Sequence, residues 1–329
     1  VRGDFSVCAI GTCTHVDGKR VFAFGHGFQD TGETLYPLSV AYVYSIIPKH
    51  DMSFKVGAPL REVGVVRQDR QSGVMGVLGM KAPMVPVRIA LGNKTTGRVE
   101  EFELVIVANR TLFQRMLMLS IREAFSKAER TLGANTKHFA LKVKLKGVEE
   151  TWSYEDAFVA FDDGFSRLLI TLVDRVMNHP TQRAEFESID LDVRIENVDR
   201  RGIIEKVTAS KDEVRPGEEV DLLVRVRRKE GGELFYERIP VRIPMDAPAG
   251  NYTIAVLGGD NVSADVAAPV DVLDIPKLYD AFHKSTELFA VMPTGRVNLD
   301  LDGRLLRNLP LSAVARLARS PSATKVRIY

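Results

Sequence analysis

Cysteine, tryptophan, long apolar runs and net charge are all scarce in this chain of 329 residues. Its two cysteines are too few for a disulfide-stapled scaffold or a zinc site. No apolar run reaches the ~18–20 residues that cross a bilayer, so we expect no transmembrane segment. The 45 basic and 43 acidic residues leave a net charge of +2, which argues against a nucleic-acid partner.

The two cysteines, Cys8 and Cys13, fall on one expected strand that covers residues 5–16. Five residues apart, they point to opposite faces of that strand, so they do not form an intrachain disulfide. We expect both to be small buried apolar residues. His15, His50, His138, His179 and His283 lack the spacing of metal ligands, and we predict no metal site.

The composition is that of an ordinary globular protein, with 45% hydrophobic and 27% charged residues. The length suits two or three domains, each with its own core. The chain starts abruptly in a strand, without an initiator methionine, so we interpret Val1 as a cut end. A missing targeting segment then says nothing about the compartment.

Residues 1–110 have the pattern of an all-β segment. Short apolar runs at 41–47, 73–78, 85–91 and 101–107 alternate with turns rich in glycine and proline. Strands at this spacing are typical of a small barrel or sandwich.

Two amphipathic helices follow, in a connecting segment at residues 111–186. The first is expected to begin at Thr111, where Gln114 completes a capping box, and to end at Gly133. The second follows Asp163 and ends before Pro180. Residues 139–148 between them alternate as a strand.

Residues 187–272 return to short strands, at 189–198, 203–209, 219–227, 234–243 and 252–257. This spacing favours an immunoglobulin-like sandwich. A helix near residues 277–284 and a hairpin make up a tail at residues 273–329. We therefore predict a mainly β, multi-domain α+β protein.

The feature that points most directly to chemistry is a histidine between two glycines. Residues 21–28 read Val-Phe-Ala-Phe-Gly-His-Gly-Phe, after an Asp17-Gly18 turn that predicts a β-hairpin. Gly25 and Gly27 lack Cβ atoms, so a substrate or another backbone could approach the His26 ring closely. An imidazole with a pKa near ~6.5 is suited to proton transfer at neutral pH.

These motifs resemble those of the stage IV sporulation protein B peptidase family. The matching residues run in order through the first 110 residues: Gly11-Thr12, His15-Val16-Asp17-Gly18, Phe24-Gly25-His26, Gly32, Pro37-Leu38, Ser53-Phe54-Lys55, Gln68-Asp69-Arg70, Gly73, Gly76, Leu78-Gly79 and Pro86-Val87. The rest of the chain looks like the C-terminal extension of larger bacterial members. The resemblance implies a trypsin-like barrel segment, a serine endopeptidase activity on protein or peptide substrates, and a location in the bacterial cell envelope or outside the cell.

By this resemblance, His26 is the general base of a Ser-His mechanism, which needs no metal or organic cofactor. Asp69 is a weaker candidate for orienting its ring. The nucleophile motif of the family, Gly-Met-Ser-Gly-Ser-Pro, is absent from this sequence. No serine of the same segment lies in a nucleophile-elbow motif. The candidates are Ser39, Ser45, Ser53 and Ser72, of which Ser72 is the strongest, although it is weak.

The missing motif leaves two interpretations open. The nucleophile half lies on another polypeptide or was trimmed away, in which case this chain alone is inactive. Alternatively, the protein has lost catalysis and is an envelope scaffold or protein-binding module that keeps the peptidase fold, with sheet edges free to accept a strand.

Overall fold

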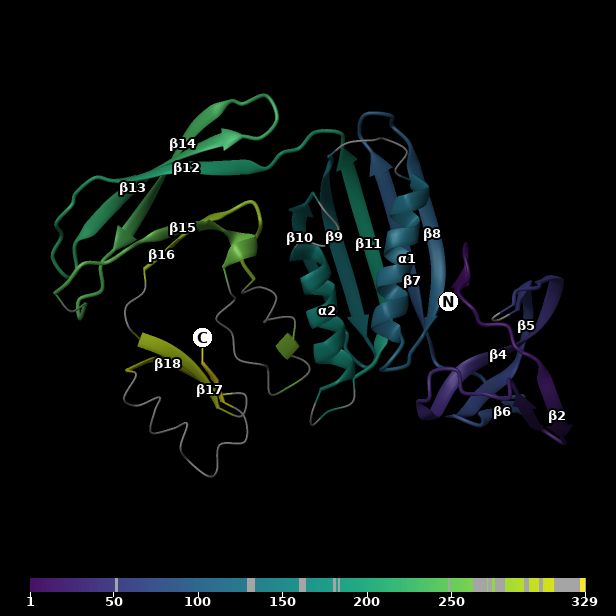
Figure 1. Cartoon of the computed structure of the whole chain (residues 1–329). Helices are drawn as coiled ribbons and strands as arrows, with labels where there is room; N and C mark the ends of the chain where they lie inside the picture. The colour runs from purple at the N-terminus through teal and green to yellow at the C-terminus, as the bar shows by residue number, and fades with distance from the viewer. Residues whose placement is uncertain are drawn as a thin grey trace.

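The computed structural model describes residues 1–50, 53–128, 134–159, 164–179, 182, 184–247, 249–262, 271, 274–275, 282–292, 296–301, 304–310 and 326–328. The protein is mainly β, with two α-helices and several sheets, and it has the expected multi-domain α+β architecture (Figure 1). Over the described residues the sheets stay open. The segment expected to be a barrel is therefore an open sheet.

The largest sheet has six strands in the order β1-β8-β7-β11-β9-β10. Their bounds are Arg2–Gly3 (β1), Met84–Asn93 (β7), Val99–Val107 (β8), Thr136–Leu145 (β9), Thr151–Phe158 (β10) and Phe186–Glu196 (β11). β11 pairs in parallel with β7 and antiparallel with β9, and so joins two hairpins that are consecutive in sequence. This sheet crosses the segment boundaries expected at residues 110 and 187, because β7, β8 and β11 complete it.

Both helices, α1 (Phe113–Ala128) and α2 (Gly164–Met177), cover one face of this sheet (Figure 1). Ile89, Leu141 and Leu191 on the strands meet Phe113 and Leu169 on the helices, and all five side chains are almost fully buried. Burying one such side chain stabilises the fold by about 1.5–3 kcal/mol. The periodicity that predicted the two helices therefore also predicted their buried faces.

The start of α1 differs from the expected capping box. The Asn109 side-chain oxygen accepts hydrogen bonds from the backbone N–H groups of Thr111, at 3.0 Å, and Leu112, at 3.1 Å. Thr111 is exposed, and its hydroxyl accepts no N–H group of the described residues. The prediction was wrong because the cap lies two residues earlier, before a turn that leads into the helix. The expected end at Gly133 lies outside the described residues.

A second sheet has five strands in the order β2-β3-β6-β5-β4. Their bounds are Cys13–Asp17 (β2), Arg20–Ala23 (β3), Gly32–Ile47 (β4), Phe54–Arg70 (β5) and Gly73–Leu78 (β6). Its small core, with Ala23, Tyr36 and Val74, also includes Val107 and Leu112 from the end of β8 and the approach to α1. The second sheet is thereby packed against the first.

The hairpin between β2 and β3 forms as expected, but its turn is one residue later. Asp17 pairs with Arg20, so the two central residues are Gly18 and Lys19. Gly18 has φ +55°, and a positive φ at the first central position is the pattern of a type II′ turn. Residues 5–12 lie outside the strand, and Cys8 and Cys13 are exposed free thiols, so their expected burial was wrong.

The third region has a three-stranded sheet, β12 (Gly202–Ala209), β13 (Glu219–Arg228) and β14 (Leu234–Arg242), and a two-stranded sheet, β15 (Ala255–Gly258) and β16 (Leu288–Val291). Leu222, Val224 and Val226 of β13 form one core with Val256 of β15, as two facing layers do in a sandwich. The immunoglobulin-like identity of this sandwich stays a prediction.

In the tail, β17 (Arg296–Leu301) and β18 (Arg304–Pro310) pair as the expected hairpin, and β19 (Val326–Ile328) adds to β17. Most of the helix expected near residues 277–284 lies outside the described residues.

The third region is tied to the six-stranded sheet at its first residues. The Thr136 hydroxyl on β9 donates to the Val198 carbonyl at 2.7 Å and accepts from the Arg200 backbone N–H at 2.9 Å. Buried Asp199 receives two hydrogen bonds from the Arg201 guanidinium. These bonds outweigh the opposing effect of burial and hold the pKa of Asp199 below its ordinary value.

A second tie lies near the end of the region. The Ser285 backbone N–H donates to both carboxylate oxygens of Asp156 on β10, at 3.0 Å each. The Ser285 hydroxyl lies 2.7 Å from one of these oxygens and 2.7 Å from the Ala157 carbonyl. The intervening residues are thus fixed to the six-stranded sheet at both ends.

The cap of α1 gives a direct test. Replacing Asn109 by alanine removes two N–H acceptors, and we expect it to lower the free energy of unfolding by about 0.5–2 kcal/mol. Thr111→Ala is the matched control, with an expected change within about 0.5 kcal/mol because its hydroxyl caps nothing. Urea unfolding followed by circular dichroism measures both. Equal losses for the two variants would contradict the assignment of the cap.

Candidate functional site

His26 lies in the loop that follows β3, at the end of the hairpin where the sequence predicted it. The strand stops at Ala23, and the next two residues, Phe24 and Gly25, have φ of +77° and +74°. A positive φ costs glycine little but strains a bulky residue such as Phe24 by about 1–3 kcal/mol. The Phe24 backbone N–H still donates to the Thr12 carbonyl at 2.9 Å. Strain of this kind is concentrated at functional sites.

The His26 ring is exposed, and its hydrogen bond to the Gly27 carbonyl fixes its tautomer. Nδ1 lies 2.6 Å from the carbonyl oxygen of Gly27. A carbonyl oxygen can only accept, so Nδ1 carries the proton and, in the neutral ring, Nε2 has a free lone pair. The Phe24 ring lies 5.8 Å from the imidazole, centroid to centroid. The arrangement leaves Nε2 able to take a proton from an approaching group.

The two glycines beside His26 have different roles. A Cβ on Gly25 would meet nothing within 4 Å, so the space at this position is open. A Cβ on Gly27 would overlap the Asp30 carboxylate and lie 3.0 Å from the Arg70 carbonyl. The loop therefore packs closely around Gly27, whereas Gly25 borders open space.

Asp69 is fully buried at the end of β5, where it holds the loop after His26. Its carboxylate accepts the backbone N–H groups of Phe28 at 2.7 Å, Gln29 at 2.8 Å and Thr31 at 3.4 Å, and the Thr31 hydroxyl at 3.3 Å. Burial alone would raise the pKa of Asp69. The hydrogen bonds from Phe28, Gln29 and Thr31 outweigh it and bring the pKa below its ordinary value.

Asp69 thus forms no hydrogen bond with the imidazole of His26, the role considered from the sequence. Its oxygens are occupied by the loop, and the ring is oriented by the Gly27 carbonyl instead. The carboxylate positions the histidine indirectly, by fixing the backbone that follows it. The sequence pattern did not show the contribution of Thr31, whose hydroxyl also lies 2.9 Å from the Tyr36 hydroxyl.

No serine hydroxyl of the described residues forms a hydrogen bond with His26. Ser72 follows Gln71, whose carbonyl accepts a hydrogen bond from the Gly27 backbone N–H at 3.1 Å. Ser53 lies far along the hairpin, where its hydroxyl accepts the Lys49 N–H at 3.3 Å. Over the described residues, the imidazole of His26 therefore has no serine hydroxyl as a hydrogen-bond partner.

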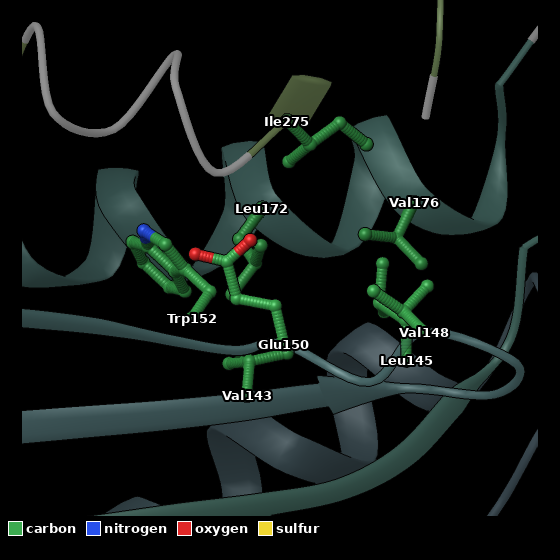
Figure 2. A pocket seen from close by; sticks show the side chains of 8 residues that line it. All are labelled: Val143, Leu145, Val148, Glu150, Trp152, Leu172, Val176 and Ile275. Atoms are coloured by element: carbon green, nitrogen blue, oxygen red, sulfur yellow. The ribbon is translucent and has the colours of Figure 1, made fainter. Parts of the chain in front are cut away.

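Two hollows elsewhere are less suited to chemistry. One is a cavity of about 30 Å³ between β9, β10 and α2, where Glu150 and Trp152 face Leu172 and Val176 (Figure 2). This space is enough for about one water molecule. The other is a groove of about 460 Å³ over β1, β7, β8 and β11, where Arg88 is already paired with Asp192, at 2.8 Å, and with Glu101.

Within the described ranges no three His, Cys, Asp or Glu side chains are grouped so that they could hold a metal ion. No helix there is both long enough and apolar enough to span a membrane.

The buried carboxylate gives a pH-dependent prediction. The folded-state pKa of Asp69 is lowered, so its stabilisation is complete above about pH 4 and is lost as pH falls through the folded-state pKa. Asp69→Asn places an NH₂ group against backbone N–H donors, and we expect the free energy of unfolding to fall by about 1–3 kcal/mol at neutral pH. The loss of stability below pH 4 should become shallower.

Asp17→Asn is the control for this experiment, because Asp17 is an exposed carboxylate of the same sheet. Its effect should stay within about 0.5 kcal/mol. Chemical unfolding at several pH values measures both variants, and an Asp69→Asn protein as stable as Asp17→Asn at neutral pH would refute the loop-holding role.

Comparison with known proteins gives little further guidance. No protein-family model and no curated protein matches the chain. A solved structure of a superantigen-like protein from Staphylococcus aureus, in complex with 3-N-acetylneuraminyl-N-acetyllactosamine, aligns with 50% of this chain and 91% of its own. The two are 11% identical, with a TM-score of 0.16, a value too low to establish a shared fold.

Proposed function

We propose that this chain supplies the general base of a Ser-His endopeptidase of the stage IV sporulation protein B type, with His26 as that base. The observation that supports the proposal most is the tautomer of His26. Nδ1–H is bound to the Gly27 carbonyl, which leaves Nε2 of the exposed neutral ring with a free lone pair. This is the protonation pattern that a general base needs before it meets a serine hydroxyl.

In the proposed reaction, Nε2 of His26 takes the proton of a serine hydroxyl as the serine oxygen bonds to the carbonyl carbon of the substrate peptide. The imidazolium then gives this proton to the leaving amine as the C–N bond breaks. A water molecule repeats the two steps and releases the acid product. The serine comes from a nucleophile-bearing segment outside this sequence, and the mechanism uses no metal or organic cofactor.

Asp69 contributes to this reaction as a positioning residue. It fixes the backbone at residues 28–31, and so holds the Gly27 carbonyl in place against Nδ1. A neutral carbonyl stabilises an imidazolium less than a carboxylate does. The base is therefore well oriented but weakly supported electrostatically.

The second candidate function is a non-catalytic scaffold or protein-binding module that keeps the peptidase-like segment. It is favoured by the observation that no serine of the described residues is bonded to His26. In either case the resemblance favours a bacterial protein of the cell envelope or the extracellular space, acting on or binding protein or peptide.

A fluorophosphonate probe separates the two candidates, because it labels only an activated serine. We expect no labelling of this chain alone. A longer form of the polypeptide that carries the Gly-Met-Ser-Gly-Ser-Pro segment should be labelled, and His26→Ala should slow its labelling by a factor of about 10³ or more. His15→Ala is the control, since His15 is an exposed histidine of the same sheet, stacked on Phe22.

Equal labelling rates for the wild type and His26→Ala would remove His26 from the mechanism. A probe adduct on any serine of this chain alone would show that the nucleophile lies within it. If the longer form has another residue in place of the motif serine, the scaffold function is the correct one.

A further inference from the structure

A row of aromatic rings leads away from the imidazole of His26. The centroid of the Phe24 ring lies 5.8 Å from that of the imidazole, and the Phe28 ring meets Phe24 edge to face at 6.3 Å. Phe28 in turn meets the ring of Tyr36 edge to face at 6.0 Å. We call the side chains of Phe24 and Phe28 the aromatic shelf. It begins directly beside the proposed base.

Phe28 is held firmly but remains partly uncovered. Its backbone N–H donates to Asp69 at 2.7 Å. Its ring contacts Tyr36, which is buried and whose hydroxyl lies 2.9 Å from the hydroxyl of Thr31. Phe28 is nevertheless 37% exposed. An apolar ring that is already fixed in place loses little conformational freedom when it binds, so this exposed surface is suited to recognition.

The proposed reaction determines which part of a substrate comes close to the aromatic shelf. Nε2 of His26 gives its proton to the leaving amine, so the residue that supplies this amine must lie beside the imidazole. This is the residue directly after the cleaved bond. Next to His26 the space at Gly25 is open, since an added Cβ there would meet nothing within 4 Å. The side chain of the substrate residue is then within reach of Phe24 and Phe28.

The charged groups of this loop do not favour a substrate side chain of either sign. The Asp30 carboxylate lies close to Gly27, and the oppositely charged Arg70 guanidinium lies close to Gly32. The carboxylate of Asp69 is fully buried and already accepts hydrogen bonds from the loop. Contact with the apolar rings is therefore what distinguishes one substrate side chain from another.

We propose that the aromatic shelf selects an aromatic or large aliphatic side chain in the substrate residue that follows the cleaved bond. This assignment rests on the proposed peptidase function and adds the class of substrate to it. Phe28 is the specificity-determining residue, because it offers exposed ring surface. Phe24 supports the Phe28 ring on the side of the imidazole.

Digestion of a mixed peptide library by the longer, nucleophile-bearing form tests the aromatic shelf, with the cleaved bonds identified by mass spectrometry. We expect aromatic and large aliphatic residues to be enriched after the cleaved bond. Phe28→Ser should lower this enrichment about fivefold, the effect of losing one aromatic contact, and Phe28→Leu should keep most of it. Phe22→Ser is the matched control and should change nothing, because Phe22 is 38% exposed on the same sheet but stacks on His15.

The fluorophosphonate probe separates a failure of the aromatic shelf from a failure of the peptidase. The probe carries no amino-acid residue on its leaving side, so Phe28→Ser should be labelled at the wild-type rate, which also shows that the variant is folded around His26. Slower labelling would make Phe28 a positioning residue and overturn its role in selection. Normal labelling without apolar enrichment, or with an enrichment that Phe28→Ser leaves unchanged, overturns the shelf alone. A longer form that is never labelled refutes the peptidase, and the shelf with it.

Discussion

The parallel pairing of β11 with β7 is the constraint on which the rest of the molecule depends. It brings residues about a hundred positions apart into register, Ile189 with Val87 and Leu191 with Ile89, and it closes the gap between two hairpins that could not form a sheet alone. The helices then have one apolar face to cover. The end of β8 and the approach to α1 in turn supply Val107 and Leu112 to the core of the second sheet. Both the sheet that carries His26 and the sandwich are therefore positioned by a contact that the local sequence does not encode.

Much of the local structure could be predicted from the sequence, because periodicity and turn residues act over a few positions. The strand at 73–78 and both helices are examples. The strand β10 was missed, although Trp152 and Tyr154 alternate with polar neighbours, because the run is short and carries two acidic residues. The cap of α1 was misplaced because Asn109 and Thr111 are both good capping residues, and only the path of the preceding turn distinguishes them. Strand partners across the chain could not be predicted, since alternation defines a face but not a neighbour.

The candidate site, too, could be predicted from the sequence only in part. The exposed imidazole and the open space beside Gly25 follow from the residues around them, and the structure has both. The role of Asp69 does not follow from the sequence. Nothing in the pattern distinguishes a carboxylate that orients a ring from one that accepts hydrogen bonds from backbone N–H groups about forty positions away. The hydrogen bonds of Asp69 fix the backbone of the loop whether or not the protein is a catalyst. A non-catalytic scaffold would need Asp69 as much as an enzyme would, because in both the carboxylate holds the loop. The two differ only in whether Nε2 of His26 takes a proton.

The two ties at Thr136 and Ser285 determine how mechanical load passes through the molecule. They anchor residues 198–200 to β9 and residue 285 to β10, which are neighbouring strands of the same sheet. Tension applied between the N-terminal sheet and the tail is therefore carried through β16 and Ser285 into Asp156, and β12 to β15, which lie between the ties, are bypassed. While these hydrogen bonds hold, β16 alone of these five strands bears the load, and pulling on the chain would strain its pairing with β15 before it stretched the other strands.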